Sequence, residues 1–251
     1  MLPSTMPSQQ PARGADRPLL TYCDDATGER TDLTAVELGG WAARTAGLLR
    51  DDCGLVAGDR AAVLLPPHWQ TAAVLLGAWS LGVTVSYRSW AVAGLPSARP
   101  GEDEPYDALF VSTARLGSWL ESVPEARHRF AHGLGPGAAT LDEVPDGYRD
   151  YVAAAGYHPG DVPAPQAVRY TDAASPDGTT YRQWGTIAHA IAERMELRPG
   201  DRVLVDTGAH VEPVTWLLAP LAAGASILLC ANLDRETLDR RRAAEGVTHV
   251  L

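Results

Sequence analysis

The chain has 251 residues, of which 45% are hydrophobic and 21% are charged, and its formal net charge is −10 at pH 7. This composition is sufficient for one large core or two smaller ones, and it excludes a largely disordered chain. Acidic residues are in excess and no long basic run is present, which argues against nucleic acid or an anionic membrane surface as the main partner.

The cysteines and the apolar segments predict a cytoplasmic protein without a membrane span. Cys23, Cys53 and Cys230 are odd in number and form no Cys-x-x-Cys pair, which argues against a disulfide framework and a zinc site. The uncharged stretches 61–87 and 213–233 are interrupted by prolines and small or polar residues. Each therefore predicts a strand and a short helix instead of one membrane helix.

The predicted elements begin after residues 1–18, which lack the features of a signal peptide and are expected to form a disordered tail. The first series is a helix capped by Thr34 and Glu37, a strand at 61–65, a helix at 69–81, a strand at 83–87, a connector at 88–105, a strand at 106–112 and a helix at 140–155. After the proline-rich passage 159–165, the second series is a helix capped by Thr180 and Gln183, strands at 202–206 and 225–229, a helix at 235–244 and a strand from 247.

This alternation of short apolar strands and helices predicts an α/β fold with two similar parallel-sheet lobes and flanking helices. We expect the first lobe to span residues 19–158 and the second to span residues 159–251, with both packed as one unit. We also expect the lobes to meet where the strands at 60–65 and 202–206 run.

An internal repeat supports the two-lobe prediction. An offset of 142 residues places Leu55, Gly58, Asp59, Arg60, Val63, His68, Leu76 and Gly82 on Leu197, Gly200, Asp201, Arg202, Val205, His210, Leu218 and Gly224. No gap is needed over this stretch. The contiguous Gly-Asp-Arg followed by a matched His and Gly is difficult to attribute to composition.

Part of the first half resembles the amino-terminal lobe of the adenylate-forming superfamily, which includes the acyl-CoA synthetases. The segments that carry this resemblance are Ala26-Thr27-Gly28-Glu29-Arg30, the Thr34 helix, the stretch from Leu55 to Val63, Pro66 and Leu81-Gly82-Val83. The large domain of that superfamily is built from two similar subdomains, so the resemblance and the repeat imply the same fold. The chain also ends where the resemblance places the adenine-binding segment, so we expect a truncated member like other short proteins that correspond to the front part of these enzymes.

The phosphate loop of the superfamily is degenerate here. The superfamily's pattern is roughly Tyr-Thr-Ser-Gly-Ser/Thr-Thr-Gly-x-Pro-Lys-Gly, and the matching stretch is Tyr170-Thr171-Asp172-Ala173-Ala174-Ser175-Pro176-Asp177-Gly178. Pro176 removes one backbone N–H donor, and Asp172 and Asp177 would repel a triphosphate. All 21 basic residues of the chain are arginine, so the catalytic lysines that the resemblance implies are missing. We expect no ATP-dependent ligation.

The candidate ligand-binding residues are Tyr170 and Thr171 together with the segment Thr207-Gly208-Ala209-His210. The resemblance implies that His210 lies in the acyl pocket, and parallel α/β sheets bind ligands beyond the carboxyl ends of their strands. His68 is the repeat counterpart of His210. The alternative interpretation of both histidines is that each caps its helix or packs between the lobes.

No catalytic residue, metal site or cofactor is predicted. His128 and His132 are four residues apart, but without a third ligand they are interpreted as a surface pair on a helix. Trp41, Trp184 and Trp216 are expected to lie in the core.

The leading functional prediction is a catalytically degenerate binding module for an apolar or neutral acyl-like molecule or for a partner protein. Two alternatives remain: an enzyme that reuses the acyl crevice for chemistry without ATP, with His210 as acid or base, and a half-enzyme completed by a partner. Self-association through an exposed surface is a further possibility.

Overall fold

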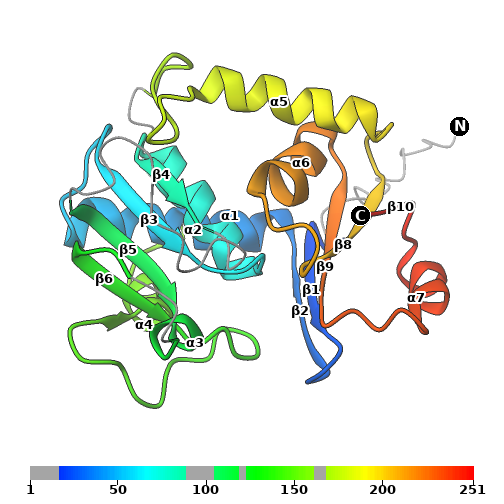
Figure 1. The fold of residues 1–251 in the computed structure, drawn as a ribbon, viewed down its shortest axis with the longest axis horizontal. Helices are drawn as coiled ribbons and strands as arrows, with labels where there is room; N and C mark the ends of the chain where they lie inside the picture. Colours follow the sequence, from blue (N-terminus) through cyan, green and yellow to red (C-terminus); the bar gives the residue numbers. More distant parts are fainter. Residues whose placement is uncertain (1–16, 89–104, 119–122, 161–167) are drawn as a thin grey trace, which may run out of the picture.

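The computed structural model describes residues 17–88, 105–118, 123–160 and 168–251, and within them the chain forms two five-stranded sheets with helices packed on and between them (Figure 1). This confirms the α/β prediction of two largely parallel sheets. Residues 1–16, 89–104 and 161–167 lie outside the described residues, and they include most of the expected tail, connector and proline-rich passage.

The first sheet is entirely parallel and has the strand order β4-β3-β5-β6-β7. Its strands are β3 Arg60–Leu64, β4 Thr84–Tyr87, β5 Tyr106–Ser112, β6 Ala126–His132 and β7 Arg149–Asp150. Its helices are α1 Ala35–Gly47, which continues into the π-helical turn η1 Leu48–Asp52, α2 Trp69–Ser80, α3 Thr113–Leu116 and α4 Tyr151–Gly156. Strands β3 and β5 are buried over almost their whole length, as expected for central strands covered on both faces.

The second sheet has the order β10-β8-β9-β1-β2, in which only the β1–β2 hairpin is antiparallel. Its strands are β1 Leu20–Asp24, β2 Glu29–Leu33, β8 Arg202–Asp206, β9 Ser226–Ala231 and β10 His249–Val250. Its helical segments are α5 Tyr181–Arg194, the π-helical η3 Val214–Leu218, α6 Ala219–Ala223 and α7 Leu238–Glu245.

The position of β1 and β2 differs from the predicted lobe limits. Both strands fall inside the range 19–158, yet β1 pairs with β9 of the second sheet. Nearly all of β1 is buried, so it needs cover on both faces, and the exposed edge of β9 provides a partner strand. Local sequence does not specify which edge a strand will join.

The first and second sheets, each with its helices, are called the first and second halves of the fold. They share their strand pairing at the 142-residue offset. Arg60 pairs with Thr84 in the first sheet, and Arg202 pairs with Ser226 in the second. The turns before these strands match as well, because Gly58 N donates to Gly82 O at 2.9 Å and Gly200 N donates to Gly224 O at 3.0 Å. The φ angles of Gly58 and Gly200 are 95° and 90°, which explains the glycine in each Gly-Asp-Arg motif.

Other boundaries differ for local reasons. The helix expected at 140–155 is limited to α4, where Asp150 accepts a hydrogen bond from Ala153 N at 2.6 Å, because Pro145 and Gly147 interrupt the preceding segment. His128 and His132 lie on strand β6 and not on a helix. His132 is buried, so its interpretation as a surface residue was wrong.

The contact between the two halves runs through helices. Helix α1 lies against β2 and helix α2 lies against β1, while α5 spans both halves along one side of the molecule (Figure 1). One hydrophobic cluster includes residues from both sheets, among them Leu20, Val63 and Leu229. The expectation that strands 60–65 and 202–206 form the junction is therefore corrected to helices packed between the sheets. None of the helices in the described ranges has the length and apolarity that a membrane crossing requires.

Candidate functional site

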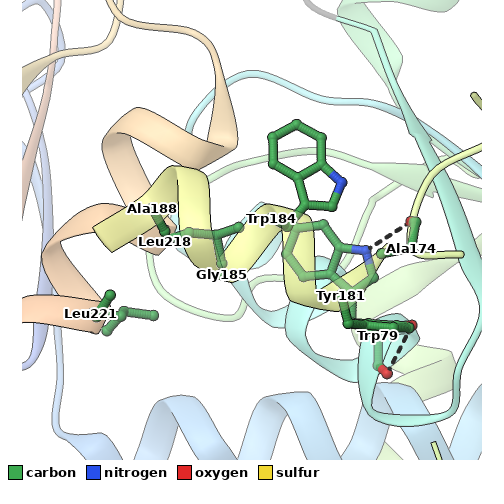
Figure 2. Close-up of a pocket in the computed structure, with 9 residues that line it drawn as sticks. Trp79, Ala174, Tyr181, Trp184, Gly185, Ala188, Leu218 and Leu221 are labelled. Carbon is green, nitrogen blue, oxygen red and sulfur yellow. Dashed lines mark hydrogen bonds between the residues drawn. The ribbon is translucent and has the colours of Figure 1, made fainter. Parts of the chain in front are cut away.

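An open groove lies where helix α5 crosses from the first half to the second (Figure 2). Its volume is about 380 Å³. Helix α2, the loop before α5, helix α5, and the η3–α6 segment contribute the lining residues, which are Trp79, Ala174, Tyr181, Trp184, Gly185, Ala188, Leu218, Leu221 and Ala222. The groove therefore combines elements from both halves of the chain.

Helix α5 forms one wall of the groove because of its small residues. The helix begins with the predicted capping box, in which Gln183 N donates to Thr180 Oγ1 at 3.3 Å and Thr180 N donates to Gln183 Oε1 at 2.8 Å. Gly185 is exposed, and a Cβ atom built on it would meet no atom within 4 Å. The missing side chain at Gly185 and the short one at Ala188 leave space beside the ring of Trp184.

The aromatic residues of the groove use their polar atoms for hydrogen bonds within the protein. Trp79 Nε1 donates to Ala174 O at 3.3 Å, and Trp184 Nε1 donates to Ser175 Oγ at 3.1 Å. Tyr181 Oη donates to Trp79 O at 3.2 Å, and burial raises the pKa of Tyr181, so this phenol stays neutral. The three rings therefore present mainly carbon to the groove, which suits an apolar occupant.

The stretch Tyr170–Gly178, which was predicted from sequence to be a degenerate phosphate loop, directs its backbone donors towards acceptors of the same loop. Ala174 N and Ser175 N both donate to Thr179 O, at 2.8 and 3.3 Å, and Gly178 N donates to Ser175 O at 3.0 Å. Asp177 Oδ1 accepts hydrogen bonds from Ser175 Oγ at 2.8 Å and from Thr179 N at 3.0 Å. A phosphate group would have to displace these contacts before the same amides could bind it.

Only Ala174 of the predicted loop and ligand-binding residues lines the groove. Tyr170 is 77% exposed and Thr171 is exposed, outside the groove lining. The remaining loop residues, Asp172, Ala173, Ser175, Pro176, Asp177 and Gly178, do not line the groove. Two of them are hydrogen-bonded to residues that do, because Tyr181 N donates to Asp172 O at 3.1 Å and Trp184 Nε1 donates to Ser175 Oγ. The groove is thus distinct from the predicted crevice.

Residues Thr207–His210 form a tight turn at the carboxyl end of β8. Thr207 N donates to Cys230 O at 3.0 Å, and Gly208 N donates to Asp206 Oδ1 at 3.0 Å. His210 N donates to Asp206 O at 2.9 Å, and the residue is half-buried. None of Thr207, Gly208, Ala209 and His210 belongs to the groove lining, so their role in ligand binding stays a prediction.

His68 has a structural role that the alternative interpretation anticipated. Its Nδ1 atom accepts a hydrogen bond from Gln70 N at 3.2 Å at the start of α2, and its ring lies 4.3 Å from that of Tyr22. Burial lowers the pKa of His68 to about 3. His132 contacts Gln70 Oε1 at 2.8 Å, and burial holds its pKa well below the usual value. Both histidines are neutral core residues at pH 7, and the described residues contain no group of three or more potential metal ligands.

Sequence reasoning missed most of the groove. Trp79, Leu218 and Leu221 come from elements whose contact with α5 depends on tertiary packing. The available signal was the apolar stripe of α5 with Gly185 beside Trp184. Trp184 itself was expected in the core, but it is half-buried at the groove wall.

Solved structures share this fold. The chain superposes on an acyl-CoA synthetase from Brucella canis with a TM-score of 0.71 and 21% identity, covering 95% of this chain and 45% of that one. It superposes on the N-terminal domain of FACL13 from Mycobacterium tuberculosis with a TM-score of 0.65 and 16% identity, covering 92% of this chain and 58% of that one. The fold is therefore that of the N-terminal part of adenylate-forming enzymes, and the chain spans about half the length of these solved relatives.

A closer sequence relative defines the family. The chain is 37% identical over 240 residues to a TIGR03089 family protein of Mycobacterium tuberculosis strain H37Rv, covering 93% of this chain and 91% of that protein. It belongs to the TIGR03089 family. No family model matches the chain.

Proposed function

We propose that this protein is a binding module in which the α5 groove takes an apolar, acyl-like group, and that it performs no ATP-dependent ligation. The observation that carries the proposal is a groove of about 380 Å³ lined by aromatic and aliphatic side chains whose polar atoms are already hydrogen-bonded. Pockets of this size and composition suit small apolar ligands. A partner protein that inserts an apolar side chain is the second occupant consistent with this chemistry.

The phosphate loop supports the absence of ligation. Its amides donate to Thr179 O and Ser175 O within the loop, and Asp172 and Asp177 add negative charge where a triphosphate would bind. The sequence has no lysine that could offset this charge. Both features oppose the electrostatic stabilisation on which adenylation depends.

Proteins of similar fold hold small molecules. One solved structure contains the FACL13 N-terminal domain with an inhibitor bound, and another contains the anthranilate CoA ligase AuaEII with anthranoyl-AMP. We extend to this chain only the capacity to hold a small molecule. The three free cysteines support the further proposal of a cytoplasmic location.

The groove is tested by filling it. The Gly185→Leu variant places a side chain into open space on an exposed position of α5, so it should fold normally and occlude the groove. The matched control is Gly39→Leu, which makes the same change at an exposed position of α1 where a Cβ atom also meets nothing within 4 Å.

Titration with the neutral fluorophore N-phenyl-1-naphthylamine, followed by competition with fatty acids of increasing length, measures occupancy. We expect saturable binding to the unmodified protein and to Gly39→Leu, and affinity weaker by about tenfold or more in Gly185→Leu because its side chain occupies the ligand volume. Equal affinity in all three proteins would place the probe elsewhere and refute the groove as the binding site.

A further inference from the structure

Two cysteines that are 207 residues apart in sequence face each other in the second sheet. Cys23 on β1 and Cys230 on β9 are direct partners in the parallel register, and both belong to the same small hydrophobic cluster on one face of the sheet. Neighbouring strands lie roughly 4.8 Å apart, which falls within the Cα separation of about 4.4–6.8 Å that a disulfide requires. Both thiols are free.

The surroundings of this pair contain two guanidinium groups. Arg30 Nη1 lies 3.8 Å from Cys23 Sγ, and Arg241 Nη1 lies 3.3 Å from Cys230 Sγ. Burial nevertheless raises the pKa of Cys230 to about 11 and raises that of Cys23. Both thiols are therefore protonated at pH 7 while they stay buried. Arg30 lies on β2 and favours the Cys23 thiolate once water reaches the site, whereas Arg241 lies on α7.

Helix α7 covers the pair and is held mainly by charges. None of its residues is fully buried, and Leu238 provides its apolar contact with the cysteine cluster. Glu245 at its end binds Arg30 at 2.5 Å and Arg202 at 3.1 Å, and Arg241 pairs with Asp25. A short helix with so little buried apolar surface belongs to the part of a fold that opens most readily.

We propose that Cys23 and Cys230 form a redox modification site, in which a peroxide converts the facing thiols into a reversible disulfide when α7 opens. The Cys23 thiolate, from the more exposed of the two residues, attacks one peroxide oxygen, so that an S–O bond forms, the O–O bond breaks and a sulfenic acid results. The other peroxide oxygen leaves as hydroxide or alkoxide and is protonated to water or an alcohol. The Cys230 sulfur then attacks the sulfenic sulfur. The S–S bond forms, the S–O bond breaks, and the hydroxyl group leaves as water with the thiol proton. The two thiols lose two electrons in total, which the peroxide accepts.

The product would tie the N-terminal strand β1 covalently to β9. The β1–β2 hairpin packs against α1 and α2 of the first half. The disulfide would therefore fix to β9 the hairpin through which the second sheet contacts the first half. This inference is independent of the groove.

The sequence allows the reaction to be mapped directly. Because every basic residue is arginine and trypsin does not cleave between Arg17 and Pro18, tryptic digestion places the three cysteines in separate peptides, 14–30, 51–60 and 203–235. Folded protein is treated with hydrogen peroxide, alkylated, and digested without reduction for mass spectrometry. We expect a cross-linked pair of peptides 14–30 and 203–235 that has lost two hydrogens and is restored by dithiothreitol, while Cys53 remains alkylated.

Variants test whether the ion pairs of Glu245 control the reaction. Glu245→Gln removes the charge that holds α7 and should accelerate cross-linking by roughly two- to tenfold. Asp239→Asn, on the same helix but 97% exposed, should leave the rate unchanged. In Cys230→Ala, Cys23 should advance to a sulfinic acid without any cross-link.

Two outcomes would overturn the proposal. One is oxidation of Cys53, a buried cysteine without a cysteine partner, at the same rate as the pair. The other is oxidation of Cys23 and Cys230 as single modifications, without a cross-link, in the protein of unchanged sequence. This second test does not depend on the folding of any variant.

Discussion

At the scale of single residues, His68 and His210 show how equivalent sequence positions acquire different environments. Both follow a parallel strand at the same distance, 142 residues apart. His68 is 1% exposed and caps α2, whereas His210 is half-buried in the turn after β8. The rings of Tyr22 and Trp69 pack against His68. The two halves therefore share strand pairing at this offset but not the surroundings of these two side chains.

The first prediction compares alanine substitutions of these two histidines. His68→Ala should lower the free energy of unfolding by about 2–4 kcal/mol, since it removes a buried ring and a helix cap. His210→Ala should cost about 1 kcal/mol or less, because the residue is half-buried and its backbone N–H contact is retained. Urea unfolding followed by circular dichroism gives both values. Equal losses of unfolding free energy in the two variants would show that His210 is a core residue like His68. Weaker binding of N-phenyl-1-naphthylamine to His210→Ala would instead support the predicted site at Thr207–His210.

At the scale of elements, α7 differs from α1 and α5 in what holds it. The capping boxes at Thr34 and Thr180 and the apolar faces of α1 and α5 are encoded within each segment. Helix α7 instead depends on Arg30 and Arg202 from β2 and β8. The hydrogen bond of Glu245 with Arg30 has the largest effect on its pKa, and the contact with Arg202 adds to it. Together they hold the pKa of Glu245 below its ordinary value of 4.5.

A second prediction follows from the sign of this shift. Because the folded-state pKa of Glu245 lies below the unfolded value, its contribution is fully present above the unfolded pKa and is lost as the pH falls through the folded pKa. Glu245→Gln should therefore lower stability by about 1 kcal/mol near neutral pH and by progressively less as the pH falls from about 5 towards 3. Urea unfolding midpoints of both proteins across this range measure the difference. A stability gap that does not change with pH, or one equally large in Asp239→Asn, would contradict it.

At the scale of the whole molecule, one core connects the two sheets. Helices α1 and α2 pack against β1 and β2, so the N-terminal hairpin belongs to the second sheet while it covers helices of the first half. Helix α5 then crosses both halves and forms the groove. The groove depends on this assembly, because its lining combines α2 of the first half with α5 and α6 of the second.

The third prediction concerns activity of the whole chain. With ATP, magnesium and a panel of carboxylic acids, purified protein should show no pyrophosphate exchange above the protein-free control, because the phosphate-loop amides are engaged within the loop and no lysine is present. The comparison variant is Asp177→Ala, which frees Ser175 and Thr179 from Asp177. Exchange that survives repurification and changes in rate in Asp177→Ala would belong to this chain and would refute the proposed loss of ligase chemistry.

The sequence alone determined the elements whose signals are local. Strands 106–112 and 202–206 occur where they were predicted, and both capping boxes form, because burial pattern and helix caps depend on neighbouring residues. The resemblance to adenylate-forming enzymes was carried by turn residues such as Gly58 and Gly82, whose positive φ angles fix the backbone. The class of fold was therefore accessible from sequence.

Only the tertiary structure decided where these elements meet. The pairing of β1 with β9, the facing of Cys23 and Cys230, and the groove between α5, α2 and α6 each join segments that are far apart in the chain. The free energy of such contacts comes from burying apolar surface, which is non-directional and leaves no local pattern to identify the partner. Local hydrogen bonding therefore specified the elements, and packing specified the sites.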